Sequence, residues 1–298
     1  VEKTREELKK KSRVYEKGGA WWLRSTDFGD DKDRVLIKSD KTYTYLTPDI
    51  AYHHEKFERG FEEIINILGP DHHGYIARLK ASQAALGHDP EKIKILIAQL
   101  VTLYEGTKQV RMSTRAGEFI TLRQVLDEVG RDAGRFFFLM RKFDAHLDFD
   151  LALAKSQTPD NPVFYIQYAY ARLNQIFAKV FIGDEPAFGG KSLRLKDGGR
   201  NLKLLKEQEE MQLMRKMAKF PELIESEAQN YQVHRLAQYT LELARDFHNF
   251  YDKHRIVQED KNLEQARLSL CYATASVLKS ALDLMGVSAP KKMKSTEY

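Results

Sequence analysis

The sequence predicts an α/β region followed by an all-helical region. Short apolar, β-rich runs separated by turn residues occur only before about residue 155. After that point the pattern changes to long amphipathic helices without strand-like alternation. At 298 residues, with 42% apolar and 31% charged side chains, the chain can bury two cores. We therefore expect two domains, at residues 1–155 and 156–298.

The first region contains six segments with strand or helix patterns. The Gly69-Pro70 pair ends one apolar run in the way that is typical of a buried parallel strand. The run at 92–104 also suits a buried strand, although its periodicity permits a helix. The expected elements are strands at 34–40 and 42–47 forming a hairpin, buried strands at 64–69 and 92–104, a helix at 75–86, and a helix at 121–130 with Thr121 as N-cap.

The second region is predicted to be a helical bundle. A Gly-rich, charged stretch at 183–200 interrupts it and is typical of an exposed loop. The expected helices cover about 161–182, 201–228, 231–254 and 262–286.

Composition limits the classes of protein that remain. No run of about 18 apolar residues is present, so no membrane span is expected. The single cysteine, Cys271, excludes a disulfide framework, favours a reducing cytoplasm, and suits a small buried side chain. A net charge of +5 permits nucleic-acid binding without requiring it. Because Val1 lies inside a charged helical pattern, we expect a fragment or a processed chain.

The stretch KQVRMSTRAGEF (108–119) is a candidate anion-binding loop. It combines three basic side chains, two hydroxyls and a glycine between a strand-like and a helix-like run. Backbone N–H groups before a helix, flanked by Arg and Ser/Thr, can hold phosphates. A solvated turn is the alternative, and the sequence contains neither a Walker loop nor a GxGxxG motif.

Tyr45 and Asp49 form a second candidate site, four residues apart across a turn that is expected to open a helix at Pro48. The carboxylate could pair with the guanidinium of a cationic substrate while the tyrosine covers its plane. The alternative is that Asp49 only caps the helix and interacts with its dipole.

Two histidine pairs raise the question of a metal site. Asp71, His72 and His73 are consecutive, but adjacent histidines rarely chelate one ion, and the same objection applies to His53-His54. We expect no metal there and polar surface residues instead. A serine hydrolase is not supported either, because no GxSxG motif is present.

Aromatic residues alternate with basic and amide residues in the helical region, at 164–172 and 245–255. Side chains at helical spacing usually form core, which we expect of Phe164, Phe247 and Phe250. Tyr168, Tyr251 and Arg255 could instead stack on unpaired RNA bases, with burial in the core as the alternative.

Taken together and in order, these stretches resemble the class I arginyl-tRNA synthetases. WWLRSTDFGDDKDRVLIKSDKTYTYLTPDIAYHHEKF resembles the catalytic domain, and RMSTR takes the place of the KMSKS loop. AGRFFFLMRKFDAHLDFDLALA resembles the segment that follows. NPVFYIQYAYARL, HRLAQYTLELARDFHNFYDKHRI, QARLSLCYATASVLKSALDLMGVSAP and Met293 resemble the helical anticodon-binding domain.

The resemblance implies roles for particular residues. Tyr45 and Asp49 would contact the substrate arginine; the glutamine that completes this pocket in some relatives is absent near Asp71 and His72, and His72 stands there instead. Other positions would contact ATP (with Mg²⁺ expected) and tRNA(Arg). They are Arg111, Met112, Ser113, Thr114 and Arg115 at the ATP phosphates, and Tyr168, Tyr251 and Met293 at the anticodon. We expect Arg255, from the aromatic and basic pattern around it, to contact the tRNA as well.

The resemblance also implies an incomplete catalytic domain. Neither the HIGH-type motif nor the family's amino-terminal domain occurs in these residues, so only the second half of the Rossmann-like fold is expected. The parent would be a cytoplasmic, monomeric arginine–tRNA ligase with no membrane partner. This portion alone would not form the adenylate. The alternative is a non-catalytic RNA-binding module.

Overall fold

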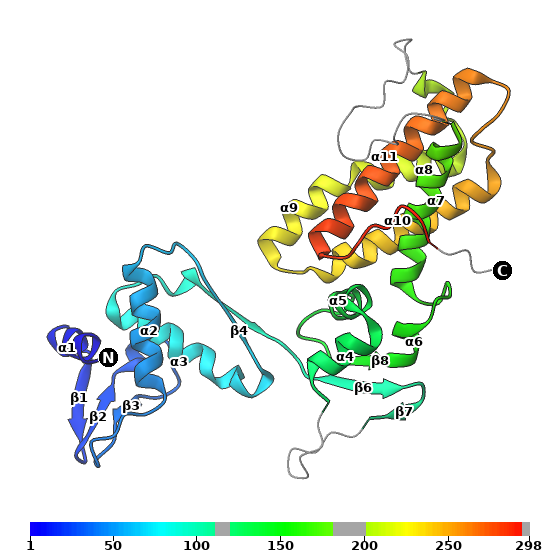
Figure 1. Cartoon of the computed structure of the whole chain (residues 1–298). Coiled ribbons are helices and arrows are strands. Elements are labelled where there is room, and N and C mark those ends of the chain that lie inside the picture. Colours follow the sequence, from blue (N-terminus) through cyan, green and yellow to red (C-terminus); the bar gives the residue numbers. More distant parts are fainter. Residues whose placement is uncertain (111–119, 181–200, 294–298) are drawn as a thin grey trace. The chain divides into compact units, whose positions relative to one another are not determined.

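The computed structural model describes residues 1–110, 120–180 and 201–293. The chain forms two compact units, each considered by itself (Figure 1). The first comprises Val1–Leu100 with Phe143–Ala145, and the second comprises Val101–Lys142 with His146–Tyr298. The boundary between the two compact units lies between Leu100 and Val101. The predicted boundary between the two family domains, near residue 155, remains a prediction.

The first unit contains two small sheets and three helices. Strands β1, β2 and β3 form an antiparallel sheet, while β4 and β5 pair in parallel from Ile64↔Ile93 to Leu68↔Ile97. The bounds are α1 Glu2–Lys10, β1 Val14–Lys17, β2 Ala20–Leu23, β3 Arg34–Ile37, α2 Leu46–Glu58, β4 Ile64–Leu68, α3 Ile76–Leu86 and β5 Ile93–Ile97, with 3-10 turns at Ser25–Phe28 (η1), Pro70–Tyr75 (η2) and Pro90–Lys92 (η3).

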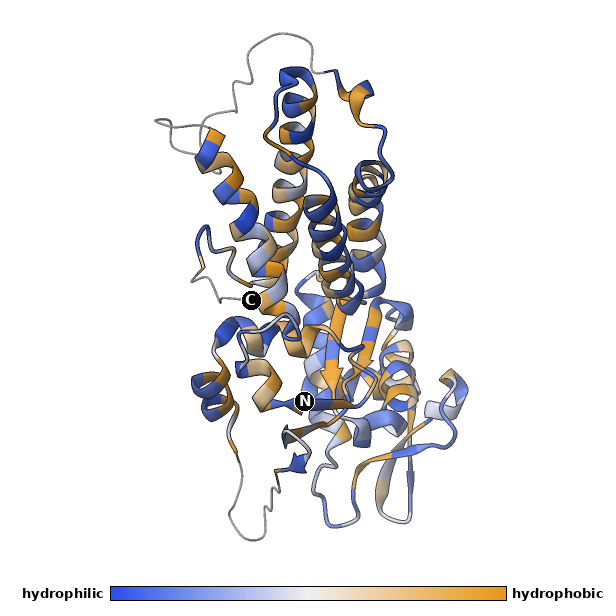
Figure 2. Ribbon diagram, turned by 90° about the vertical axis from the view of Figure 1, so that its right-hand side faces the viewer, coloured by the Kyte–Doolittle hydropathy of each residue, from blue (hydrophilic) through white to orange (hydrophobic). Residues whose placement is uncertain are grey.

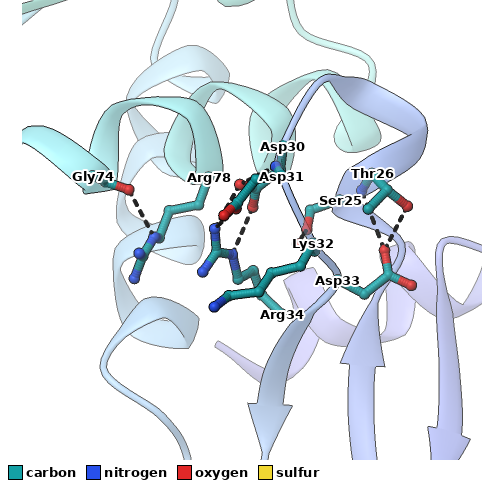
Figure 3. A network of polar contacts seen from close by, with 9 residues as sticks. All are labelled: Ser25, Thr26, Asp30, Asp31, Lys32, Asp33, Arg34, Gly74 and Arg78. Atoms are coloured by element: carbon teal, nitrogen blue, oxygen red, sulfur yellow. Dashed lines mark hydrogen bonds and ion pairs between the residues drawn. The ribbon is translucent and has the colours of Figure 1, made fainter.

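A polar network holds the connection between β2 and β3 (Figure 3). Asp30 is buried and accepts two hydrogen bonds of 2.7 Å from Arg34. Burial alone would raise the pKa of Asp30, but the hydrogen bonds from Arg34 and its neighbours hold it below the ordinary value. Ser25, at the start of this connection, donates to the carbonyl of Lys32 near its end, so the hydrogen bond joins the two ends of the connection.

The second unit joins a small sheet to a helical bundle. Strand β6 pairs antiparallel with β7 and parallel with β8. The bounds are β6 Val101–Glu105, β7 Lys108–Gln109, α4 Leu122–Val129, α5 Arg131–Leu139, β8 Leu147–Asp150, α6 Leu151–Lys155, α7 Pro162–Val180, α8 Gln208–Ala218, α9 Phe220–Asn230, α10 His234–Lys253 and α11 Lys261–Met285, with a 3-10 turn at Leu202–Leu204 (η4).

The bundle closes over a continuous apolar core. Its helices carry hydrophobic residues on one side and hydrophilic residues on the other (Figure 2). Phe177, Phe247 and Phe250 are fully buried, and Phe164 is nearly so, which confirms the core prediction for Phe164, Phe247 and Phe250. Cys271 is also in this core, where burial raises the pKa of its thiol.

Three predicted elements were wrong in extent. Residues 42–47 form no strand beyond a bridge from Tyr43 to Ile37, because α2 already begins at Leu46. The run at 92–104 is two strands of different sheets. The helix expected at 201–228 is divided at Phe220-Pro221, since proline suits only a first helical turn. By contrast, Thr121 is the N-cap of α4, as predicted, and it also forms a complete capping box with Gln124.

A buried ion pair joins α8 to α11. Arg267 donates from Nε to Glu210 Oε1 over 2.7 Å, and both side chains are almost inaccessible. Glu210 also accepts from the backbone N–H of Glu207, while Arg267 donates from Nη1 to the carbonyl of Arg255. The pair therefore fixes the start of α8 and the backbone at Arg255 together.

Replacing Glu210 by Ala should lower the free energy of unfolding by about 3–5 kcal/mol, because Arg267 would be left as an unpaired buried charge. Urea denaturation of the purified chain measures this. Lys3→Ala, at the exposed Lys3–Glu58 pair, is the control and should change stability little. A loss below about 1 kcal/mol for Glu210→Ala would contradict the prediction.

Candidate functional site

The first turn of α2 places Tyr45 and Asp49 on one face of the helix. Tyr45 immediately precedes Leu46, where the helix begins two residues earlier than predicted. The Tyr45 side chain is 82% exposed, and Asp49 is partly exposed. Residues four apart on a helix are neighbours, so the two side chains can contact one ligand.

Tyr75 holds the carboxylate of Asp49. Its phenol donates to Asp49 Oδ2 over 2.5 Å. Burial, and then the hydrogen bond to Asp49, raise the pKa of Tyr75, so its hydroxyl stays protonated. Tyr75 ends the GPDHHGY turn directly before a helix, and no spacing in the sequence relates it to Asp49, so sequence reasoning missed this contact.

His53 holds the backbone of the same turn. Its Nδ1 donates to the carbonyl of Asp49 over 2.8 Å, and its Nε2 lies 3.1 Å from the side-chain amide of Asn66 on β4. His53 and His54 are buried, so the expectation that this pair is surface polar was wrong. His54 Nδ1 lies 2.7 Å from His88 Nε2. His53 and His54 therefore both form hydrogen bonds within the fold.

His72 lies on η2, beside Tyr75. The two rings are perpendicular with centroids 6.3 Å apart, and His72 Nδ1 lies 3.1 Å from Asp71 Oδ1. Within the described ranges no group of three or more His, Cys, Asp or Glu side chains has a geometry that could hold a metal ion. The turn thus brings His72 next to the residue that contacts Asp49.

Residues 111–119 of the predicted phosphate loop lie outside the described residues, and they include Arg111, Met112, Ser113, Thr114 and Arg115. Its neighbours are described. Strand β6 precedes the loop, the short strand β7 is formed by its first two residues, and the capped helix α4 follows it. The strand before the loop and the helix after it are therefore as expected.

Tyr168 on α7 and Tyr251 on α10 meet at Arg172. The Arg172 guanidinium lies 4.7 Å from the centroid of each ring and donates to the Tyr168 hydroxyl over 2.7 Å. Both tyrosines are partly exposed, unlike the phenylalanines of the core. This arrangement offers aromatic faces and a cation, which suits stacking with an unpaired base.

His248 lies behind Tyr168. The two rings are nearly parallel with centroids 5.8 Å apart, and His248 is buried. Burial, followed by the nearby charge of Arg172, lowers the pKa of His248 to about 4. The imidazole is therefore neutral at physiological pH.

Arg255 and Met293 belong to segments anchored near this cluster. Arg255 follows α10 with an exposed side chain, and its carbonyl accepts from Arg267. The segment leading to Met293 is held at Ser288, whose carbonyl accepts from Gln167 over 3.0 Å, one residue before Tyr168. Met293 itself is half-buried.

Two family models match the chain in succession. The catalytic domain of the class I tRNA synthetases (R) matches residues 1–138, and the DALR anticodon-binding domain matches residues 166–293. The chain belongs to the arginyl-tRNA synthetase family. Its α/β part and its helical part thus correspond to a portion of the class I catalytic domain and to the DALR domain.

Similar arginyl-tRNA synthetases extend over nearly all of the chain. Arginine–tRNA ligases from Citrifermentans bemidjiense and Halalkalibacterium halodurans are 48% and 47% identical, over 97% and 98% of this chain and 51% of each relative. The chain therefore spans about half the length of the curated relatives it matches.

Solved structures of arginyl-tRNA synthetases resemble the fold of this chain. An arginyl-tRNA synthetase structure from Campylobacter jejuni superimposes with a TM-score of 0.85 at 36% identity, covering 98% of this chain and 62% of the other. The Thermus thermophilus enzyme gives a TM-score of 0.79 at 22% identity, with coverages of 98% and 58%, and supports the fold alone.

From the lowered pKa of His248 we predict that the free energy of unfolding of the chain decreases on mild acidification. In the unfolded chain a histidine titrates near pH 6.5, whereas folded His248 titrates at about 4. Between these values the unfolded state binds more protons than the folded state. The contribution of His248 to the free energy of unfolding is therefore fully present above pH 6.5 and is lost as the pH falls toward 4.

We expect His248→Gln to reduce the stability lost between pH 7 and pH 5 by about 2 kcal/mol, as measured by urea denaturation at both values. His146→Gln is the control, because His146 is exposed. Equal pH dependence in the wild-type chain and in His248→Gln would show that His248 is not held neutral.

Proposed function

We propose that this chain contributes part of the arginine pocket, the KMSKS-like loop and the anticodon-binding domain to an arginine–tRNA ligase. The reaction is the ATP-dependent activation of arginine followed by its transfer to tRNA(Arg). The observation that supports the proposal most is the Asp49 carboxylate, held by Tyr75 beside an exposed Tyr45. A fixed carboxylate beside an open aromatic face suits a guanidinium group.

In this proposal Asp49 recognises the charge of arginine and Tyr45 covers the guanidinium plane. Tyr75 occupies Oδ2, so Oδ1 and the remaining lone pair of Oδ2 can accept N–H groups. His72 stands where some relatives supply a further contact. Its ring lies beside Tyr75 and on the same turn, at the edge of this site.

ATP is the proposed co-substrate, with Mg²⁺. Residues Arg111 to Arg115 would stabilise the charge that develops when the arginine carboxylate attacks the α-phosphate and pyrophosphate leaves. No side chain needs to act as a covalent nucleophile, because both steps are attacks by oxygen atoms of the substrates. Positioning and charge stabilisation then supply most of the rate.

The proposed RNA contact is the surface around Tyr168 and Tyr251. Two aromatic rings, the Arg172 guanidinium and the exposed Arg255 combine stacking with positive charge. We also include Met293 in this RNA surface, because the segment that leads to it is held at Ser288 by a hydrogen bond from Gln167 of α7. The resemblance to the family leads us to propose a cytoplasmic, monomeric parent enzyme. None of the described helices is long and apolar enough to cross a membrane.

The chain alone should not catalyse arginine-dependent ATP–pyrophosphate exchange, because the HIGH-type motif that binds ATP is absent from its sequence. Mixing it with a separately produced amino-terminal half should restore exchange. Exchange by the purified 298-residue chain alone would overturn this part of the proposal.

Tyr251→Ala should weaken tRNA(Arg) binding by about 10-fold or more, because stacking on an aromatic ring contributes roughly 1–3 kcal/mol per base. Filter binding measures this, with Leu284→Ala on the exposed surface of α11 as control. Unchanged affinity would remove Tyr251 from the RNA surface.

A non-catalytic RNA-binding module predicts the same loss for Tyr251→Ala. Asp49 separates the two hypotheses. In the enzyme, Asp49→Asn raises the KM for arginine in exchange or aminoacylation, whereas a pure RNA-binding module shows no dependence on arginine at all.

A further inference from the structure

We propose that Tyr75 is a positioning residue for arginine selection, which acts by fixing the orientation of the Asp49 carboxylate. The inference rests on the proposed function and adds a residue that neither the motifs nor the resemblance identified. Tyr75 lies on the turn that follows β4, and Asp49 lies on α2, so the hydrogen bond joins two separate elements of the first unit.

The backbone below Asp49 is already fixed from two directions. His53 donates to the carbonyl of Asp49 and its other nitrogen contacts Asn66 on β4. The buried Gln83 of α3 donates to the carbonyl of Ile50 over 3.0 Å. What remains free is the rotation of the Asp49 side chain itself, and the Tyr75 hydroxyl restricts that rotation.

Tyr75 is itself held in place. The His72 ring meets it edge-on, and the Arg78 guanidinium lies 5.5 Å from its ring centroid. Arg78 in turn donates to the carbonyl of Gly74, which keeps its side chain over the turn (Figure 3). The donor is therefore presented to Asp49 by a ring that is packed on two sides.

The nature of the ligand explains why orientation matters. A guanidinium is planar and presents its N–H groups as a rigid fork, so it binds well only to a carboxylate whose plane matches. An ammonium is a compact point charge without this requirement. A carboxylate free to rotate should therefore lose affinity for arginine while its affinity for lysine changes little.

Tyr75→Phe tests this in the complete polypeptide that carries these residues, since it removes only the hydroxyl. The KM for arginine should rise about 10-fold, as expected for the loss of a hydrogen bond to a charged group. The kcat and the KM for ATP should change less than about 2-fold, and the preference for arginine over lysine should fall. Tyr52→Phe is the matched control, because Tyr52 is an exposed tyrosine of α2.

A double-mutant cycle distinguishes positioning from a general structural effect. If Tyr75 acts through the Asp49 charge, Tyr75→Phe should add little to the effect of Asp49→Asn. Additive losses in KM, or an equal rise in the KM for ATP, would overturn the inference. If Asp49→Asn raises the KM for arginine but Tyr75→Phe does not, only this inference fails. If Asp49→Asn has no effect, the proposed arginine site fails as well.

Discussion

The candidate arginine site depends on one constraint, the immobilisation of the first turn of α2. Buried polar groups must find partners, and here each partner comes from a different element: His53 links the turn to β4, Gln83 reaches it from α3, and Tyr75 reaches Asp49 from η2. Because these bonds are satisfied inside the fold, they restrict the turn without relying on a ligand. The exposed Tyr45 is then the member of this group that is most open to solvent.

In the second unit the division between core and surface follows residue type. Phe247 and Phe250 are fully buried between helices, whereas Tyr251, on the same helix, keeps one part accessible and contacts Arg172. A phenol can do this because its ring packs while its hydroxyl remains hydrated or bonded. The buried Glu210–Arg267 pair is an exception to this division, because two charged side chains lie inside the bundle, where each satisfies the other and Arg267 also holds the carbonyl of Arg255, just after α10.

Much of this could be predicted from the sequence, and the failures have physical causes. Helical periodicity predicted α4, α7, α10 and α11 with small errors, and Thr121 was correctly predicted as the N-cap of α4, because these signals are local. The strand at 42–47 failed because β-rich composition was overridden by the start of α2. Tyr75 was missed because its contact with Asp49 spans 26 positions and leaves no periodic trace.

The neutral His248 has a consequence for the surface above it. Burial and the nearby Arg172 lower the pKa of the His248 imidazole to about 4, so it gains a proton only in clearly acidic solution. The His248 imidazole therefore adds no positive charge beside Arg172 and its two tyrosines at neutral or weakly acidic pH. Electrostatic attraction of a polyanion to this patch should then be governed by ionic strength and not by acidity.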